Sequence, residues 1–366
     1  ASEVNLNDIS NYSDVDNIDF ANSFNDKDSK EDTLLAGGEG LVENQSHDGG
    51  FSGTTTASFS ADMYLGSVDG GDHDTNTNKP DEKSSVMAGY SFQIDLNTSF
   101  TGEDSLDVSI DAGNSGGNGT AEFDGNSGGD TLTVDGVSYT FPVGDSATFI
   151  VGDNIDGSAL FTTACAYGGP SNTLDDCGNV NAAITNGGAM VGASYDFGTG
   201  FTAAVGYAGN EQEVMTDEGL DAYGLNAAYT GDNYGVSLTY GLLETDNGTE
   251  DTFTAFNAYY TPDGFPSISV GYEIGEDGSV TGSDDGLESI FVGLTWDEVG
   301  PGSAGIAFGT KTPTVEGYDE QYMYEAYYSY PINDGMTITP LVFVKEAAES
   351  YTDDETGLMV KTSFSF

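Results

Sequence analysis

Arginine is absent from this chain of 366 residues, and seven lysines are its only strong bases. Against them stand 62 Asp and Glu residues, which give a formal net charge of −55 at pH 7. Proteins hold nucleic acid mainly through Lys and Arg side chains that contact the phosphates. The composition therefore predicts no nucleic-acid partner.

The chain also lacks any apolar run near the roughly 18 residues that a membrane-spanning helix needs. A membrane β-barrel is still allowed, because its strands are short and apolar only at every second residue. Histidine is scarce too, since His47 and His73 are the only two and neither falls in an expected strand. A nucleophilic Ser normally needs a base beside it, so we predict that the protein is not an enzyme.

Aromatic residues and glycine are abundant, with 21 Tyr, 20 Phe and 52 Gly. Strong acidity without aromatics would indicate disorder, whereas this mixture favours strands and turns. Residues 1–51 are polar, lack alternation and are predicted to form an N-terminal periplasmic tail. The start at Ala1, with no basic apolar leader, resembles the product of signal-peptide cleavage, so we expect an exported protein.

In residues 52–366, polar and apolar side chains alternate in sixteen segments. Most segments are close to the length of roughly nine to eleven residues that a tilted strand needs to cross a bilayer. Their connections alternate in length, each odd-numbered one being longer than every even-numbered one. A membrane barrel sorts its connections in this way, with short periplasmic turns and long outer loops. We therefore predict an all-β fold, a transmembrane antiparallel β-barrel with about 16 strands around a water-filled channel. The expected strands are 52–66, 85–98, 104–112, 131–140, 146–152, 188–197, 201–208, 220–229, 234–243, 251–260, 266–274, 287–296, 302–309, 320–330, 336–345 and 357–366.

Two of these strands leave an alternative open. The Asp135-Gly136 pair could be a hairpin turn inside a long loop, and that strand would then centre on residues 137–142. In segment 251–260 the aromatic residues fall on both faces.

The period-2 alternation also assigns the lumen face, on which carboxylates far outnumber lysines. The 99–103 turn is expected to bring Asp95 opposite Asp107. Rings of carboxylates favour cations in a pore, so the sequence predicts cation selectivity; alternatively, these acids are merely solvated and the pore is weakly selective. The residues expected to line the pore are Asp62, Asp95, Asp107, Asp111, Asp196, Glu273, Glu325, Lys345 and Lys361.

The connection 153–187 is by far the longest, and it lies between the fifth and sixth expected strands. We hypothesise that it folds into the barrel as a constriction loop; the alternative is an outer loop that covers the mouth or a neighbouring subunit. It contains Cys165 and Cys177, which either form a disulfide or remain two unpaired thiols. Its candidate lining residues are Asp153, Asp156, Asp175 and Asp176.

No cofactor is expected to be required. Acidic loops such as Asp284-Asp285 and Asp353-Asp354-Glu355 could bind Ca²⁺ or Mg²⁺ through oxygen ligands. None of them has the spacing of a full calcium-binding loop, so solvated charge is the competing interpretation.

Several stretches resemble the porins of cyanobacterial outer membranes, a group labelled iron-uptake porins and distantly related to carbohydrate-selective porins. They are 99–104 (Ser-Phe-Thr-Gly-Glu-Asp), 111–114 (Asp-Ala-Gly-Asn), 139–145 (Tyr-Thr-Phe-Pro-Val-Gly-Asp), 327–334 (Tyr-Tyr-Ser-Tyr-Pro-Ile-Asn-Asp), 337–340 (Thr-Ile-Thr-Pro) and 362–366 (Thr-Ser-Phe-Ser-Phe). The resemblance implies a passive channel for inorganic ions and small solutes, usually a homotrimer, in contact with outer-membrane lipid and lipopolysaccharide.

Under this resemblance, the terminal Phe366 matches the signal that the barrel-insertion machinery reads. Many members carry an N-terminal S-layer-homology domain, for which residues 1–51 are too short. The extreme acidity suggests a marine cyanobacterium, because high salt screens charge over short distances. The rival class is a surface adhesin or S-layer-type β protein without a channel.

Overall fold

The computed structural model describes residues 54–71, 86–115, 122–123, 125–126, 128–185, 187–216, 219–245, 248–280, 286–315, 319–347 and 353–365. All of them belong to the compact unit Gly37–Phe366. The predicted tail, both histidines, the Asp284-Asp285 pair and Phe366 lie outside the described residues. In the described part, no helix is long and apolar enough to cross a membrane.

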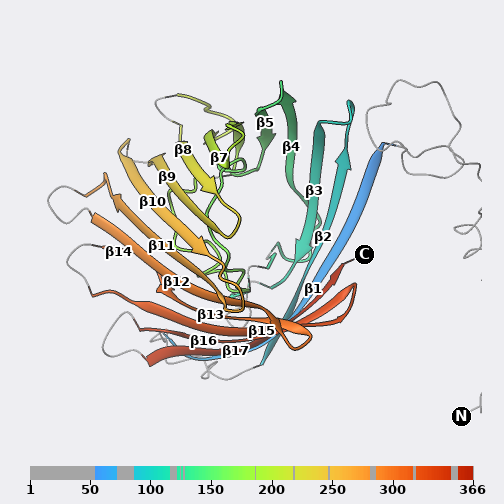
Figure 1. Cartoon of the computed structure of the whole chain (residues 1–366), viewed down its shortest axis with the longest axis vertical. Coiled ribbons are helices and arrows are strands. Elements are labelled where there is room, and N and C mark those ends of the chain that lie inside the picture. Colours follow the sequence, from blue (N-terminus) through green and yellow to red (C-terminus); the bar gives the residue numbers. More distant parts are fainter. Residues whose placement is uncertain are drawn as a thin grey trace, which may run out of the picture. The chain divides into compact units, whose positions relative to one another are not determined.

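The strands of the described chain form one antiparallel sheet that closes on itself (Figure 1). They are β1 (Thr55–Gly71), β2 (Met87–Thr98), β3 (Ser105–Gly113), β4 (Thr133–Val143), β5 (Ala147–Asp153), β6 (Ala189–Asp196), β7 (Phe201–Gly209), β8 (Asp221–Thr230), β9 (Tyr234–Glu244), β10 (Glu250–Tyr260), β11 (Ser267–Glu276), β12 (Gly286–Val299), β13 (Gly302–Thr310), β14 (Thr314–Val315), β15 (Tyr322–Asn333), β16 (Met336–Lys345) and β17 (Asp353–Ser365).

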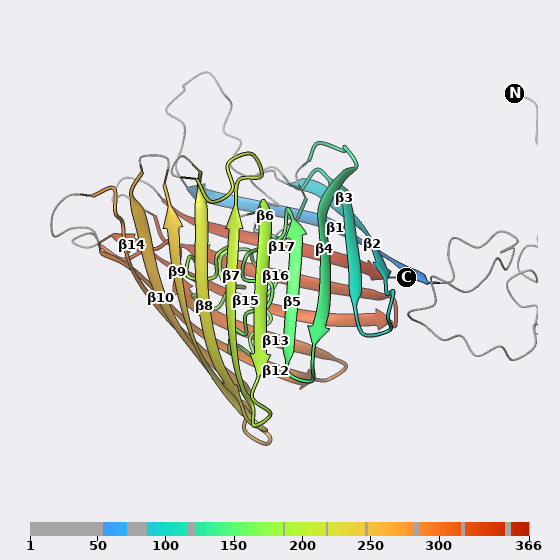
Figure 2. The same ribbon diagram turned by 90° about the horizontal axis from the view of Figure 1, so that it is seen from above.

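Sixteen of these strands form the barrel wall, and the ring closes where β1 pairs with both β2 and β17. Each of the sixteen predicted segments overlaps one wall strand, so the predicted fold class is confirmed. The prediction missed β14, which has two residues and pairs with the beginning of β12, because a strand that short has no detectable period. Figure 2 shows β4 to β10 as neighbouring strands in front of the opposite wall.

The wall strands form because polar and apolar side chains alternate along them, which suits a sheet whose outer and inner faces lie in different environments. In β9, Leu238 points outward and is 53% exposed, while its neighbours Ser237 and Thr239 point inward and are buried. The same outward apolar face recurs around the ring, as at Val205, Val270 and other exposed aliphatic side chains. Because the ring has no free edge, its backbone hydrogen-bonding groups are satisfied without water.

The connections form two classes, and the short ones are 99–104, 144–146, 197–200, 231–233, 261–266, 300–301 and 334–335. The intervening connections are longer with one exception, residues 245–249, which is shorter than both 99–104 and 261–266. There the β9–β10 hairpin extends further than expected, since the N–H of Thr245 donates to the carbonyl of Thr249 at 2.9 Å and closes a tight turn. The strict length ranking predicted from the sequence is therefore wrong at this one connection.

The 99–104 turn sets the register between β2 and β3. Asp104 accepts the Tyr139 hydroxyl at 2.6 Å and two backbone N–H groups of the turn. These hydrogen bonds, above all that from Tyr139, favour the ionised carboxylate and hold the pKa of Asp104 below its usual range. The turn is one residue longer than expected, and Asp95 lies opposite Ser109 and not, as the sequence predicted, opposite Asp107.

Strand β4 passes through the Asp135-Gly136 pair, so the hairpin-turn alternative is wrong. Ser109 pairs with Gly136 while its neighbour Ile110 pairs with Val134, which leaves Asp135 as the extra residue of a β-bulge. In β10 the aromatic residues do lie on both faces, with Phe253 buried inside and Phe256 exposed outside.

Candidate functional site in the barrel interior

The long connection 154–188 runs inside the ring of strands, where Figure 1 shows it as the green irregular trace. An extended stretch of it crosses the inner wall with alternate backbone N–H groups pointing at wall side chains. These hydrogen bonds reach three strands, β8, β9 and β11, and measure 2.8–3.0 Å: Thr162 to Asn226, Ala164 to Ser237 and Ala166 to Ser269. Each wall side chain thus supplies the acceptor that a neighbouring strand would otherwise supply.

The return leg of this connection is held by β10 and β11. The Glu273 carboxylate accepts the N–H groups of Asn181 and Ala182 at 2.9 and 2.8 Å. The side-chain amide of Asn257 donates to the carbonyl of Cys177 at 2.9 Å. Glu273 faces the interior as the alternation predicts, yet the connection covers it, so it does not face open space.

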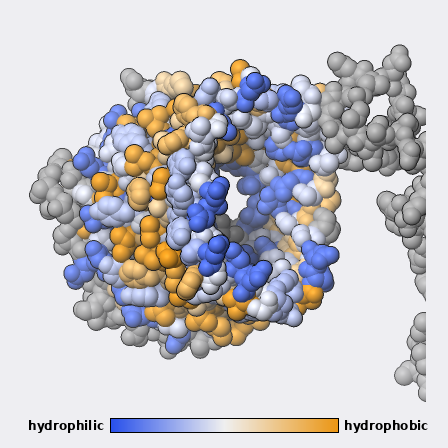
Figure 3. All heavy atoms as spheres, viewed as in Figure 1, coloured by the Kyte–Doolittle hydropathy of each residue, from blue (hydrophilic) through white to orange (hydrophobic). Residues whose placement is uncertain are grey.

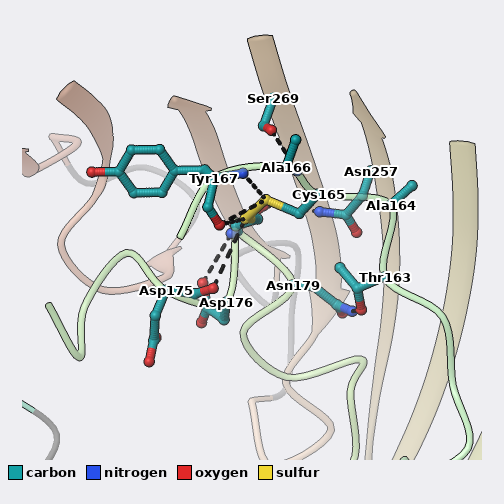
Figure 4. The surroundings of a disulfide bond; sticks show 12 residues. Thr163, Ala164, Cys165, Ala166, Tyr167, Asp175, Asp176, Asn179, Asn257 and Ser269 are labelled. Carbon is teal, nitrogen blue, oxygen red and sulfur yellow. Dashed lines mark hydrogen bonds between the residues drawn. A yellow bond between two sulfur atoms is a disulfide. The ribbon is translucent and has the colours of Figure 1, made fainter. Parts of the chain in front are cut away.

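A disulfide between Cys165 and Cys177 joins the two legs, with their Cα atoms 6.4 Å apart (Figure 4). It encloses the segment that carries Asp175 and Asp176. Asp175 is exposed, while Asp176 is half-buried and accepts the N–H of Gly178 at 2.9 Å. Burial raises the pKa of Asp176 to about 7, although the Gly178 hydrogen bond opposes that shift.

Tyr167, also within the disulfide loop, anchors the connection to the far wall. Its hydroxyl donates to the Glu325 carboxylate on β15, which is 4% exposed. Its ring lies 5.3 Å from that of Phe291 and 5.9 Å from that of Tyr327, measured between centroids. It fits because Gly293 has no side chain: a Cβ there would lie 2.7 Å from the ring.

Part of a second connection, 114–132, also lies inside the barrel, at the described residues 122 and 123, a position that the sequence did not predict. Phe123 is buried and packs on Tyr64 of β1, with ring centroids 5.5 Å apart. Glu122 forms an ion pair with Lys345 of β16, and its carbonyl accepts the N–H of Asn172 at 2.8 Å. The two inward connections therefore touch each other, and nothing in the sequence of this one separates it from other long connections.

The two inward connections enclose an apolar core inside the barrel, against the wall from β12 to β17 and β1. The interior is therefore not polar throughout, contrary to the sequence-based expectation. The buried members of this core are Tyr64, Phe123, Tyr167, Leu174, Cys177, Phe291, Ala307, Met323, Tyr327, Leu341, Phe343 and Met359.

The adjoining wall, from β1 to β4, carries several acidic side chains on its inner face. Four predicted lining carboxylates lie on this face and are half-buried: Asp62, Asp95, Asp107 and Asp111. Each accepts a hydrogen bond from a wall side chain, such as that from Thr133 to Asp111 at 2.8 Å. The bulge residue Asp135, which the prediction did not include, is exposed close to them. Figure 3 shows the barrel hollowed at its centre, with hydrophilic side chains around much of the opening.

The remaining predicted residues occupy more varied positions. Asp196 lies at the end of β6, where its carboxylate accepts the N–H of Gly198 at 2.7 Å and stabilises a turn. Lys361 lies with its ammonium group 5.8 Å from the Phe123 ring centroid. Asp153 ends β5 and, like Asp156, is exposed. Among the described residues no group of three or more His, Cys, Asp and Glu side chains is arranged to hold a metal ion.

Solved structures with a similar fold are porins. OprB of Pseudomonas putida, in its high-pH structure, superposes with a TM-score of 0.61 at 10% identity, covering 86% of this chain and 94% of that one. An engineered variant of the porin of Rhodobacter blastica gives a TM-score of 0.57 at 14% identity, covering 85% of this chain and 100% of that one. No family model matches the sequence, and no curated protein matches it significantly. The likeness at these identities establishes the porin fold.

Proposed function

We propose that the protein is an outer-membrane porin that allows passive diffusion of inorganic ions and small hydrophilic solutes. One observation carries the proposal: a closed ring of strands has an apolar exterior and a hollow that is largely edged by hydrophilic side chains. An apolar exterior suits hydrocarbon, and a ring of sixteen strands is wide enough for an aqueous channel. The similar folds belong to proteins described as porins, which supports this function over that of an adhesin.

In this proposal residues 154–188 act as the constriction loop. They are fixed to the wall from β8 to β15, so the open passage runs beside the opposite wall, from β1 to β4. The exposed carboxylates on the loop side are Asp153, Asp156 and Asp175.

We further propose that the pore prefers cations. The acids of β1 to β4 keep contact with solvent and face no arginine, because the chain has none. Among the lysines that the structure describes, Lys345 is paired with Glu122, and Lys311 donates to the Glu346 carbonyl at 3.2 Å. A carboxylate-lined passage with few opposing bases attracts cations and repels anions.

The resemblance to cyanobacterial iron-uptake porins supports four narrower proposals. Iron and other inorganic ions are among the solutes, and the protein works as a homotrimer amid outer-membrane lipid and lipopolysaccharide. The barrel-insertion machinery reads its C-terminal strand. The source is a marine cyanobacterium. Ca²⁺ or Mg²⁺ binding at the acidic segments remains a prediction. Asp354 and Glu355, expected in a loop, lie at the start of β17, and binding measurements on their variants test it.

Planar-bilayer recording across a salt gradient tests the function and the selectivity together. We expect stable channels whose reversal potential has the sign of cation preference. A purified, folded protein that gives no current, or an extract that stays soluble without detergent, would contradict the porin function and favour the adhesin. Anion selectivity would refute the cation preference alone. Liposome swelling with graded solutes then sets the size limit.

A further inference from the structure

Where the two inward connections meet the wall of β15 and β16, buried oxygen atoms lack hydrogen-bond partners among the described residues. Three such atoms gather there: Glu122 Oε1, Ser171 Oγ and Glu325 Oε2. These side chains are 6%, 1% and 4% exposed. The other unpartnered atoms in the described part belong to uncharged side chains, Asn179, Asn257, Ser289 and Thr295, which a buried water would satisfy. The first group differs because it carries charge.

The contacts around these three residues bring them to one place. Glu325 pairs with Phe343 and Met323 pairs with Lys345, so Lys345 is the diagonal neighbour of Glu325 on the same face. Lys345 forms its ion pair with Glu122, which places the Glu122 carboxylate beside that of Glu325. Ser171 also lies beside the Glu325 carboxylate, without the geometry of a hydrogen bond.

The partners already present use the other oxygens. Lys345 contacts Glu122 Oε2, and the Tyr167 hydroxyl contacts Glu325 Oε1. The second oxygen of each carboxylate has no such partner. Ser171 lies beside the Glu325 carboxylate, and its chain neighbour Asn172 donates to the Glu122 carbonyl at 2.8 Å. Two buried carboxylates face a single ammonium group, and Asp175 adds further negative charge nearby. Buried charge without compensation is strongly unfavourable, so the cluster needs additional positive charge.

We propose that a divalent cation of the Ca²⁺ class binds here, held by Glu122 Oε1, Glu325 Oε2 and Ser171 Oγ, with water completing its shell. Carboxylate and hydroxyl oxygens are the ligands that such hard cations prefer, and Ca²⁺ accepts irregular coordination. With only two carboxylates, the affinity falls in the range of about 10⁻⁴–10⁻³ M that is typical of extracellular modules. The ion joins both inward connections to the barrel wall.

The test uses the full-length protein in detergent, stripped with EDTA and then titrated with Ca²⁺ or Mg²⁺ at constant ionic strength. For the wild type we expect 10 mM Ca²⁺ to raise the unfolding midpoint by about 5 °C. Ser171→Ala keeps both carboxylates and the ion pair, and we expect it to lose at least half of that rise. Glu325→Gln should lose nearly all of it. Glu298→Gln, at an exposed position near the rim, is the matched control and should retain it.

Two outcomes overturn the proposal. If Ser171→Ala and Glu325→Gln respond to Ca²⁺ as the wild type does, the ion binds surface acids and not this site. If neither Ca²⁺ nor Mg²⁺ raises the wild-type midpoint, the cluster holds no divalent cation. Because the readout is thermal unfolding, either result is independent of whether the barrel conducts.

Discussion

The hydroxyl of Tyr167 donates a hydrogen bond to the carboxylate of Glu325, which lies 158 residues further along the chain. Tyr167 belongs to the inward connection, and Glu325 belongs to β15 of the barrel wall. Together with the Asn226, Ser237 and Ser269 contacts, this bond fixes the connection across the interior. If the connection constricts the channel as proposed, the width of the passage depends on these few contacts.

Replacing Tyr167 with Phe removes the hydroxyl and leaves a Glu325 oxygen buried without its partner. We expect a loss of about 1–3 kcal/mol in unfolding free energy. Single-channel recordings should show more frequent current fluctuations, since the connection is held less firmly. Tyr328→Phe is the control, because that hydroxyl binds the Val299 carbonyl at an exposed position. Equal behaviour of the two variants would contradict the anchoring role.

Removing the disulfide should loosen the same connection. Cys165→Ser, or reduction of the wild type, is expected to cost about 2–4 kcal/mol in stability, because the cross-link restricts the unfolded chain. Conductance should change in parallel, as followed in bilayers before and after a reductant is added. The double serine variant is the control and should not respond to the reductant. An unchanged wild-type current under reduction would argue against a constricting role for residues 154–188.

The Gly293 position allows a test by added volume. A methyl group there would lie 2.7 Å from the Tyr167 and Phe291 rings and would force them to move. We expect Gly293→Ala to lower the unfolding free energy by about 1–3 kcal/mol. Gly168→Ala lies in the inward connection itself, where an added Cβ meets nothing within 4 Å, and should be nearly neutral. Thermal unfolding of the two variants in the same detergent measures this difference in stability, and equal stability of the two variants would contradict the prediction.

The acids of the β1–β4 wall can be tested by neutralisation. Asp95→Asn combined with Asp111→Asn should lower the ratio of K⁺ to Cl⁻ permeability roughly twofold, because both carboxylates remain in contact with the lumen. The measurement is the reversal potential across a salt gradient. Asp263→Asn, in an exposed turn, should leave the ratio unchanged. An effect of Asp263→Asn as large as that of the pair would point to the general surface charge.

Asp176 predicts a pH dependence of stability. Its pKa is about 7 in the folded protein and about 3.9 in an unfolded chain, so the folded state binds the proton more tightly. The contribution of Asp176 to stability should thus be largest below about pH 4 and should be lost as the pH rises through about 7. Asp176→Asn should remove this decline and stabilise the protein at pH 8 by about 2 kcal/mol. Unfolding midpoints at several pH values test this, with exposed Asp175→Asn as the control that keeps the decline.

The barrel wall could be predicted because each strand carries its own evidence. The alternation at Ser237, Leu238 and Thr239 needs no knowledge of the partner strands. The positions of the interior segments could not be predicted in this way, because they depend on contacts between residues far apart in the sequence. Phe123 packs on Tyr64, yet neither residue's neighbours in sequence indicate that contact. Alternation also places Glu273 on the inner face without showing that another segment covers it.

The register of β2 and β3 was missed for a related reason. It depends on where the 99–104 turn ends, and the hydrogen bonds of Asp104 within this turn and with Tyr139 are contacts that the spacing does not show. The bulge at Asp135 likewise arises from the pairing of β4 with β3, and the sequence shows only an Asp-Gly pair that suits a turn equally well.

The stretch from Thr162 to Ala166 obtains its hydrogen-bond acceptors from side chains of the wall, one strand at a time. A change at Ser237 or Ser269 would consequently shift the path of this stretch while leaving every strand pairing of the cylinder intact. The position of the inward connection is therefore set by other residues than those that pair the strands. Substitutions on the inner wall could change the diameter of the passage over evolutionary time without affecting the assembly of the barrel.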